Sequence, residues 1–503
     1  MTFRLSGAMM CATVLALIVA ASAAFAQIPS SGIDAFKAPA DPRWSAIAVQ
    51  DVEAAYQLLR DNHPGAAPEL HDVAFQQSLT NAHTLALKRA RTVTSYEGYL
   101  FALAGFATDM GDKHIWSRPT FVINLPRWAG IIVSKRGDAW IVTDTEVDQS
   151  PLLGASLLSC DGEAVQDLGR KNVGGFHAVW SVGAQQIQNA PWLLIDEGNP
   201  FITRPKSCVF DSNAQHRTVT LNWVRIKREN LLPRIKKAIG AGAAGFGVRR
   251  VGQGYWIALQ DLQSDRARAV VKAVEEQKQV LREAPYVVLD LRGNGGGSSV
   301  MGRQIAASLL GAAAVDARLT PMSENCGGPD GAWRASEGNL KQLEYLQTTA
   351  LVLQGGPEQQ ELVQDTLRNV REARARGQDL SGSITCPVAP PSTAQPPSLM
   401  KGRLILLTDN LCFSSCLAVA DDFRTLGAFH VGQTTDAATH FVDVREQYLP
   451  SGYSMFSTLQ SVDPGSPRQV GPFEPVLTYS GDIADTAAVE AWVIASAVPA
   501  STR

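Results

Sequence analysis

The sequence predicts an α/β protein built on a parallel sheet, and two strand-loop-helix stretches carry this prediction. Residues 286–299 (YVVLDLRGNGGGSS) and 403–426 (RLILLTDNLCFSSCLAVADDFRTL) each begin with an uninterrupted apolar run. Uniform apolarity is typical of a strand that is covered on both faces, as in a parallel sheet. Because ligands gather at the carboxyl ends of parallel strands, we expect the loops after these two strands to face one another.

The second stretch offers a serine at a strand-to-helix turn. Asp409 and Asn410 turn the strand, and apolar residues at helical spacing from Leu417 onward predict a helix that starts near Ser414 and Ser415. A hydroxyl at such a turn lies beside unpaired backbone N–H groups and the positive end of the helix. An acyl-transfer nucleophile needs these conditions, since the same N–H groups can hold the oxyanion. An ordinary helix cap is the alternative.

The glycine-rich loop of the first stretch can supply the other half of such a site. Its glycines allow backbone N–H groups to approach a ligand closely. A phosphate-binding loop is the rival interpretation, but no Lys-Ser/Thr pair follows and the dinucleotide-binding spacing is absent. One loop then offers a nucleophile and the other offers oxyanion donors. This chemistry implies no nucleotide, no other cofactor and no metal.

Three motifs resemble those of the C-terminal processing (tail-specific) and tricorn-core serine peptidases: DLRGNGGG, CFSSCLAVADDF and VGQTT at 431–435. The resemblance covers most of the chain after residue 26. It implies an α/β core of the ClpP and crotonase kind, with a PDZ-like β domain before it. It places the nucleophile on Ser414, with Ser415 as the neighbouring alternative. The N–H groups of Ser415 and Gly296 are then the expected oxyanion donors.

One departure from the processing branch concerns the base. Where that branch has a lysine, this chain has Ala437-Ala438-Thr439, and no lysine follows Lys401. A serine hydroxyl is a weak nucleophile, so another group has to accept its proton. The resemblance therefore implies the tricorn-like variant, in which the base is a histidine.

Residues 112–114 (Asp-Lys-His) resemble the D-x-H element that carries this histidine, so we expect His114 to be the base. His440 is the alternative base, because it lies two residues beyond the alanine that is aligned with the missing lysine. A carboxylate would orient the imidazole and stabilise its charged form, and Glu474 is the expected one.

Residues 1–26 predict a secretory signal, with Arg4 before an apolar run and Ala24-Phe25-Ala26 as the cleavage signature. An uncleaved anchor is the alternative. We expect an exported protein, periplasmic or secreted, because no later stretch is long and apolar enough to span a bilayer. The formal net charge of −3 gives no indication of a nucleic-acid partner. The other expected boundaries are a helical region at 44–116, the PDZ-like domain with an insertion at 117–228, and a peptidase core at 245–495 interrupted by an insertion at 312–400.

Six cysteines follow the predicted signal, and an even number in an exported chain predicts disulfides. The sequence leaves their connectivity open. A four-residue spacing inside a helix would strain one candidate bond, and a metal site is the rival there, although no second Cys/His pair lies near it. The preferred pairs are Cys160–Cys208, Cys326–Cys386 and Cys412–Cys416.

We therefore expect a serine endopeptidase that cleaves extended polypeptides by acyl transfer. A catalytically inactive peptide- or ligand-binding relative on the same core is one alternative, and an esterase or amidase is another. The missing lysine favours the inactive relative, while the D-x-H element favours the peptidase. The sequence indicates neither the substrate nor the oligomeric state.

Overall fold

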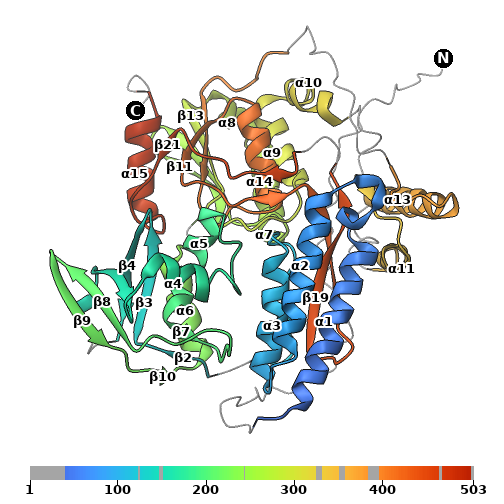
Figure 1. The fold of residues 1–503 in the computed structure, drawn as a ribbon. Coiled ribbons are helices and arrows are strands. Elements are labelled where there is room, and N and C mark those ends of the chain that lie inside the picture. The colour runs from blue at the N-terminus through green and yellow to red at the C-terminus, as the bar shows by residue number, and fades with distance from the viewer. Residues whose placement is uncertain are drawn as a thin grey trace, which may run out of the picture.

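A mostly parallel sheet lies at the centre of the computed structural model (Figure 1). Strand β11 runs antiparallel to β12, and the other neighbouring strands are parallel. The two apolar runs that predicted the sheet are its adjacent strands β13 and β15. In sheet order, the strands are β11 (Phe246–Val251), β12 (Gly254–Leu259), β13 (Tyr286–Asp290), β15 (Arg403–Thr408), β16 (Phe429–Gly432) and β21 (Leu477–Thr478).

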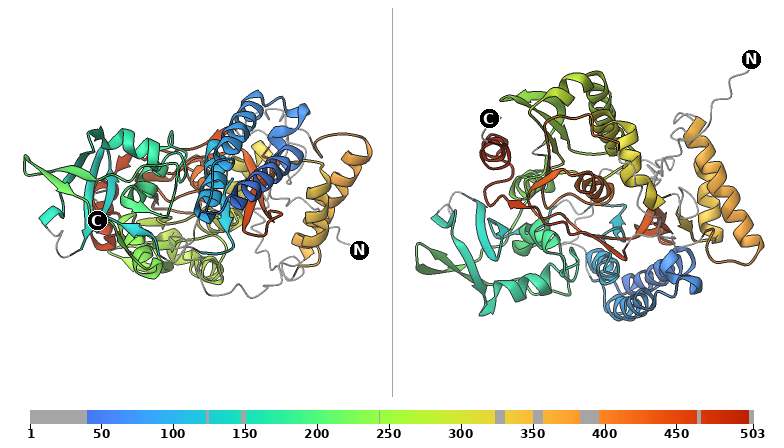
Figure 2. Two further views of the ribbon diagram at one scale, coloured as in Figure 1. Left: turned by 60° about the horizontal axis from the view of Figure 1, so that its bottom comes forward. Right: turned by 90° about the horizontal axis from the view of Figure 1, so that it is seen from above.

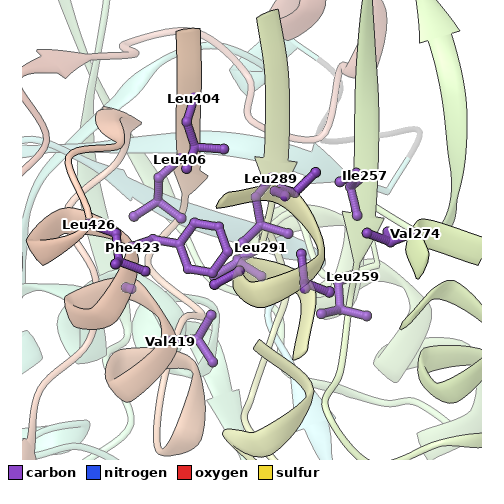
Figure 3. Packing of buried hydrophobic residues seen from close by; sticks show 14 of the residues in the cluster. Ile257, Leu259, Val274, Leu289, Leu291, Leu404, Leu406, Val419, Phe423 and Leu426 are labelled. Atoms are coloured by element: carbon purple, nitrogen blue, oxygen red, sulfur yellow. The ribbon is translucent and has the colours of Figure 1, made fainter. Parts of the chain in front are cut away.

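Helices cover both faces of this sheet, which explains why its strands are apolar throughout. In β13, Val287 and Leu289 face one buried cluster, while Tyr286 and Val288 face the other. Figure 3 shows the first cluster, where Phe423 of α14 reaches the strands. Burying each such side chain contributes about 1.5–3 kcal/mol. The covering helices are α7 (Asp265–Glu276), α8 (Lys278–Glu283), α9 (Val300–Leu310) and α14 (Ser415–Thr425) on one face, and α15 (Thr486–Ala497) on the other.

The segment expected to be PDZ-like forms an antiparallel sheet, at the lower left of Figure 1. We call residues 125–146 and 151–242 the β lobe. In the main sheet of this lobe, the strand order is β3 (Ile131–Arg136), β4 (Ala139–Thr145), β5 (Ser156–Cys160), β8 (Ser207–Ser212) and β9 (Gln215–Thr220). The short strand β6 (Glu163–Ala164) pairs with β5. A smaller sheet joins β10 (Val224–Arg225), β2 (Arg127–Trp128) and β7 (Ile195–Asp196). The helices are α4 (Val165–Asn172), α5 (Gly183–Asn189) and α6 (Arg228–Ala238).

The Cys160–Cys208 disulfide lies inside the β lobe. Its cysteines stand opposite one another on the neighbouring strands β5 and β8, with Cα atoms 4.0 Å apart. The bond therefore links two neighbouring strands of one sheet. The segment between the two cysteines contains regular structure, including α4, α5 and β7.

Three helices of the N-terminal region pack on a strand from the far end of the chain. Helices α1 (Arg43–Asn62), α2 (Val73–Ala90) and α3 (Tyr96–Asp109) share a buried cluster with β19 (Ser454–Val462). The buried Asp51 carboxylate accepts hydrogen bonds from the Tyr99 hydroxyl at 2.6 Å and the Ser451 N–H at 3.1 Å. The other strands of this sheet are β1 (Ser117–Pro119), β14 (Ala332–Trp333) and β18 (Phe441–Tyr448).

The insertion within the core carries further helices, and Figure 2 shows those drawn in orange beside the N-terminal helices. The insertion helices that the structure describes are α10 (Ala312–Ser323), α11 (Glu337–Leu346) and α13 (Pro357–Ala375), and the short strands β17 (Ala438–Thr439) and β20 (Gln469–Val470) pair near the site.

The structure describes residues 40–122, 125–146, 151–242, 244–323, 331–349, 357–382, 396–463 and 467–499. The predicted signal, Cys326 and Cys386 lie outside these ranges. Within the ranges, no helix combines the length and the apolarity that crossing a bilayer would require.

Candidate active site

Ser414 lies at the turn between β15 and α14, where the backbone is strained. Its dihedral angles are φ 57° and ψ −131°, which a residue with a Cβ rarely adopts, and its side chain is half-buried. Such a conformation costs on the order of 1–3 kcal/mol and is found mostly at functional sites. The helix begins at Ser415, as the spacing predicted.

The hydroxyl of the neighbouring residue, Ser415, already forms a hydrogen bond within the protein. Ser415 is 8% exposed, and its Oγ donates a hydrogen bond to the Gly297 carbonyl at 2.7 Å. Its N–H is at the start of α14 and has no partner among the described residues, as expected for the first turn of a helix. Ser415 therefore ties the two loops together through its side chain and leaves an N–H available as a donor.

The two loops after β13 and β15 face one another, as the parallel sheet predicted. The Phe413 N–H donates to the Asn294 carbonyl at 3.2 Å, and the Gly293 N–H donates to Asp409 Oδ2 at 2.9 Å. A Cβ on Gly296 would lie 2.8 Å from the Ser414 Cβ, closer than real Cβ contacts allow. Glycine at this position thus permits the close approach of the loops.

The Gly296 N–H does not lie open as the expected oxyanion donor. It donates to the Asn294 side-chain oxygen at 2.9 Å, while the Gly296 carbonyl accepts from the Leu262 N–H at 2.9 Å. Asn294 itself is fully buried and its amide donates to the Leu259 carbonyl at 2.7 Å. Gly296 stays a predicted oxyanion donor, and its N–H could serve an oxyanion only after this bond breaks.

A disulfide joins Cys412 and Cys416 on either side of Ser414. Cys412 lies before the start of α14, so the four-residue spacing does not fall within the helix. The Cα atoms are 5.3 Å apart, in the usual range for a disulfide. Both cysteines are fully buried, so the bond fixes the base of the nucleophile turn from inside the core.

His114 lies against the residue that precedes Ser414. Its ring centroid is 4.5 Å from that of Phe413, and the side chain is 6% exposed. The ring atom Nδ1 of His114 lies 3.2 Å from Asp112 Oδ1. The same oxygen accepts a hydrogen bond from the backbone N–H of His114 at 2.8 Å. An ionised carboxylate can only accept, so this contact assigns a proton to Nδ1, and in the neutral imidazole Nε2 then has the lone pair.

Asp112 is therefore the carboxylate that orients this imidazole. Burial raises the pKa of Asp112, but the hydrogen bonds from His114 and Thr439 outweigh it and hold this pKa below its usual range. The sequence interpretation quoted Asp112 as part of the D-x-H element but gave the orienting role to Glu474. The sequence does contain a signal for the role of Asp112, because a carboxylate two residues before a histidine can accept both its ring N–H and its backbone N–H.

The other two expected residues have different surroundings. The His440 ring packs edge-on against Phe441, with ring centroids 4.5 Å apart. The backbone N–H of His440 donates to the Arg468 carbonyl at 3.1 Å. The Glu474 side chain is exposed, and no contact between it and His114 is found among the described residues. Thr439, the neighbour of His440, donates a hydrogen bond to Asp112 of the site.

Charged groups beneath the two loops are buried. Arg292 and Asp290 form a buried ion pair at 2.7 Å. Burial and the nearby Asp290 charge raise the pKa of Asp409 to about 7, although Asp409 accepts N–H groups from Gly293 and Leu411. In the described ranges, no three His, Cys, Asp or Glu side chains gather as metal ligands would.

The fold sets a strained serine turn against a glycine loop on an α/β core. Residues 254–462 match the family model described as "Peptidase family S41", which is similar to what the motifs suggested. The structure is similar to that of mature CPAF, with a TM-score of 0.59, 16% identity, and 90% of this chain and 97% of that chain covered.

A structure of mature CPAF complexed with lactacystin gives a TM-score of 0.59 and 15% identity, over 90% of this chain and 98% of that one. At these identities the likeness establishes the fold alone. It confirms the expected α/β fold class. No curated protein matches the chain by sequence.

Proposed function

We propose that this chain is a serine endopeptidase that cleaves extended polypeptides by acyl transfer. The observation that carries the proposal is the strained backbone of Ser414, which holds a half-buried hydroxyl at the turn opposite the glycine loop. Strain of this kind is maintained only where the surroundings impose it, and here a disulfide and two loop contacts do so. The match to peptidase family S41 supports the same conclusion.

In the proposed reaction, Ser414 Oγ attacks the peptide carbonyl and His114 Nε2 accepts its proton. Asp112 holds the imidazole by its Nδ1–H and stabilises the imidazolium that forms. His114 then returns the proton to the leaving amine, and water hydrolyses the acyl-enzyme by the same route. The Ser415 N–H and N–H groups of the glycine loop stabilise the oxyanion, with the Gly296 N–H first released by Asn294.

Glu474 remains a prediction for a residue that assists this site, since its exposed side chain could contact a bound substrate. The β lobe is proposed, from the resemblance alone, to bind the substrate chain as PDZ-like domains do, by adding a strand at a sheet edge. Two disulfides support an oxidising compartment, so we propose that the protein acts after export.

The test is hydrolysis of an unfolded polypeptide by the purified mature chain, followed by mass spectrometry of the products. New amino termini that appear with the wild type and not with Ser414→Ala are expected. Hydrolysis of simple esters without peptide cleavage would instead favour the esterase alternative. Binding of the polypeptide without any cleavage would favour the inactive relative.

A further inference from the structure

An ion pair between the half-buried Lys113 and the buried Asp436 touches the turn that leads to Ser414, and the proposed mechanism does not use it. Asp436 has no exposed surface, and Lys113 Nζ donates to its Oδ2 at 2.7 Å. Gln185 donates to Asp436 Oδ1 at 3.0 Å, and Gln188 donates to Oδ2 at 2.9 Å. We call these four residues the Asp436 cluster. A buried carboxylate is tolerated when it is paired and hydrogen-bonded in this way.

The cluster makes contact with three successive parts of the turn that leads to Ser414. The Asp436 N–H donates to the Cys412 carbonyl at 3.1 Å, and the Gln188 amide also donates to the Asn410 carbonyl. The Lys113 ammonium lies 4.5 Å from the centroid of the Phe413 ring, close enough for a cation–π interaction. The same ring contacts His114, so Phe413 lies between the cluster and the imidazole.

The parts of the cluster come from three distant segments. Lys113 is the middle residue of the D-x-H element, and Asp436 directly follows VGQTT, next to the alanines that replace the family's lysine. Gln185 and Gln188 belong to α5 of the β lobe. The two charged residues of the cluster, Lys113 and Asp436, thus come from different segments, and two glutamines of the β lobe bond to Asp436.

We propose that the Asp436 cluster positions the nucleophile turn, so that Ser414 and His114 keep the separation that proton transfer requires. This inference rests on the proposed peptidase function. Lys113 acts through Phe413 and Asp436 and does not itself accept a proton, because an ammonium that donates to a carboxylate has no lone pair. A misplacement of about 1 Å at a reacting pair can lower the rate about a hundredfold, so such bracing has a measurable effect.

The experiment compares Asp436→Asn, Lys113→Met and Lys113→Arg with the wild type. It measures kcat and KM for one peptide substrate and the rate at which a serine-directed phosphonate labels Ser414. We expect the first two variants to lower kcat and labelling by about tenfold or more while KM changes by less than about threefold. Lys113→Arg should retain most of the activity, because a guanidinium keeps the charge and the donors but cannot accept a proton.

Lys171→Met is the matched control. The Lys171 ammonium forms an exposed ion pair with Glu163 at 3.4 Å on the β lobe, so kcat should be unchanged. A folded Lys113→Arg that is as inactive as Lys113→Met would overturn the inference and make the amine the proton acceptor. Wild-type kcat in both Asp436→Asn and Lys113→Met would also overturn it.

Asp436→Asn leaves the Lys113 ammonium without its counter-charge, and the variant could fail to fold. Gln188→Leu then supplies the test, since it removes only neutral hydrogen bonds to Asp436 and Asn410. A fall in kcat of about fivefold is expected, and an unchanged kcat would overturn the inference. If the wild type itself neither cleaves peptide nor is labelled at Ser414, the proposed function fails, which is a separate result.

Discussion

The segments around His114 and His440 differ in what surrounds the imidazole. His114 has a carboxylate at Nδ1 and the Phe413 ring at its side, one residue from Ser414. His440 has an aromatic ring, Phe441, at its edge, and its backbone pairs with the chain at Arg468. Thr439 precedes His440 in the chain and bonds to Asp112, and Asp112 in turn orients His114 beside the Ser414 turn.

This difference shows that a residue is not a good candidate for the base merely because it lies near the position of the missing lysine in the sequence. His440 lies close in sequence to the position of the absent lysine, and its half-buried ring packs against Phe441. His114 is 300 residues away from Ser414 in the chain, and the fold brings the two segments together. A base is defined by the partner that fixes its tautomer and by the atom that it can reach.

The largest effect is expected from removing the nucleophile. Ser414→Ala should abolish peptide cleavage while leaving the thermal unfolding midpoint nearly unchanged or raised, because the hydroxyl makes no structural hydrogen bond among the described residues. Ser415→Ala should keep activity but lose stability of about 1 kcal/mol, since it removes the bond to Gly297. Steady-state assays and thermal unfolding measure both. The opposite pattern would move the nucleophile by one residue.

The next effect separates the two histidines. His114→Ala should reduce kcat by about a thousandfold or more, as the loss of a triad member does. His440→Ala should leave kcat within about tenfold, because no proton transfer depends on it. Circular dichroism controls for folding in both variants. An inactive His440→Ala beside an active His114→Ala would reverse the assignment.

The two candidate carboxylates give a smaller difference. Asp112→Asn should lower kcat by about a hundredfold or more, since an amide can favour the wrong tautomer of His114. Glu474→Gln should change kcat by less than about threefold, because its exposed side chain does not contact the imidazole. The ratio of the two kcat values is the measurement. A larger loss in Glu474→Gln would restore the role that the sequence interpretation gave it.

A pH effect contrasts Asp112 with Asp409, whose pKa values shift in opposite directions. Burial raises the pKa of Asp409 to about 7, whereas an unfolded aspartate ionises near pH 3.8. Between these values the folded state binds more protons, so the stability that Asp409 contributes falls as pH rises from about 4 to about 7. The stability of the wild type relative to Asp409→Asn should therefore fall between pH 5 and pH 7.5 in urea unfolding. A difference that is constant with pH would show that Asp409 ionises normally.

The sequence was sufficient for the parts of the site that are local in the chain. Apolar runs predicted β13 and β15, and the helical spacing predicted the start of α14 at Ser415. The carboxylate beside His114 and the acceptor of the Gly296 N–H lie only two residues away in the chain, but the spacing alone does not show which polar group a loop brings to each donor. The packing of β19 on the N-terminal helices depends on a contact between distant segments, so the sequence pattern could not predict it.

The central claim is that Ser414 is the nucleophile and that His114 activates it. Labelling with a serine-directed phosphonate, followed by peptide mapping, tests this claim most directly. The account predicts modification of Ser414 alone in the wild type, the same modification in His440→Ala, and almost none in His114→Ala. Modification of Ser415, or labelling of Ser414 that survives in His114→Ala and disappears in His440→Ala, would contradict it.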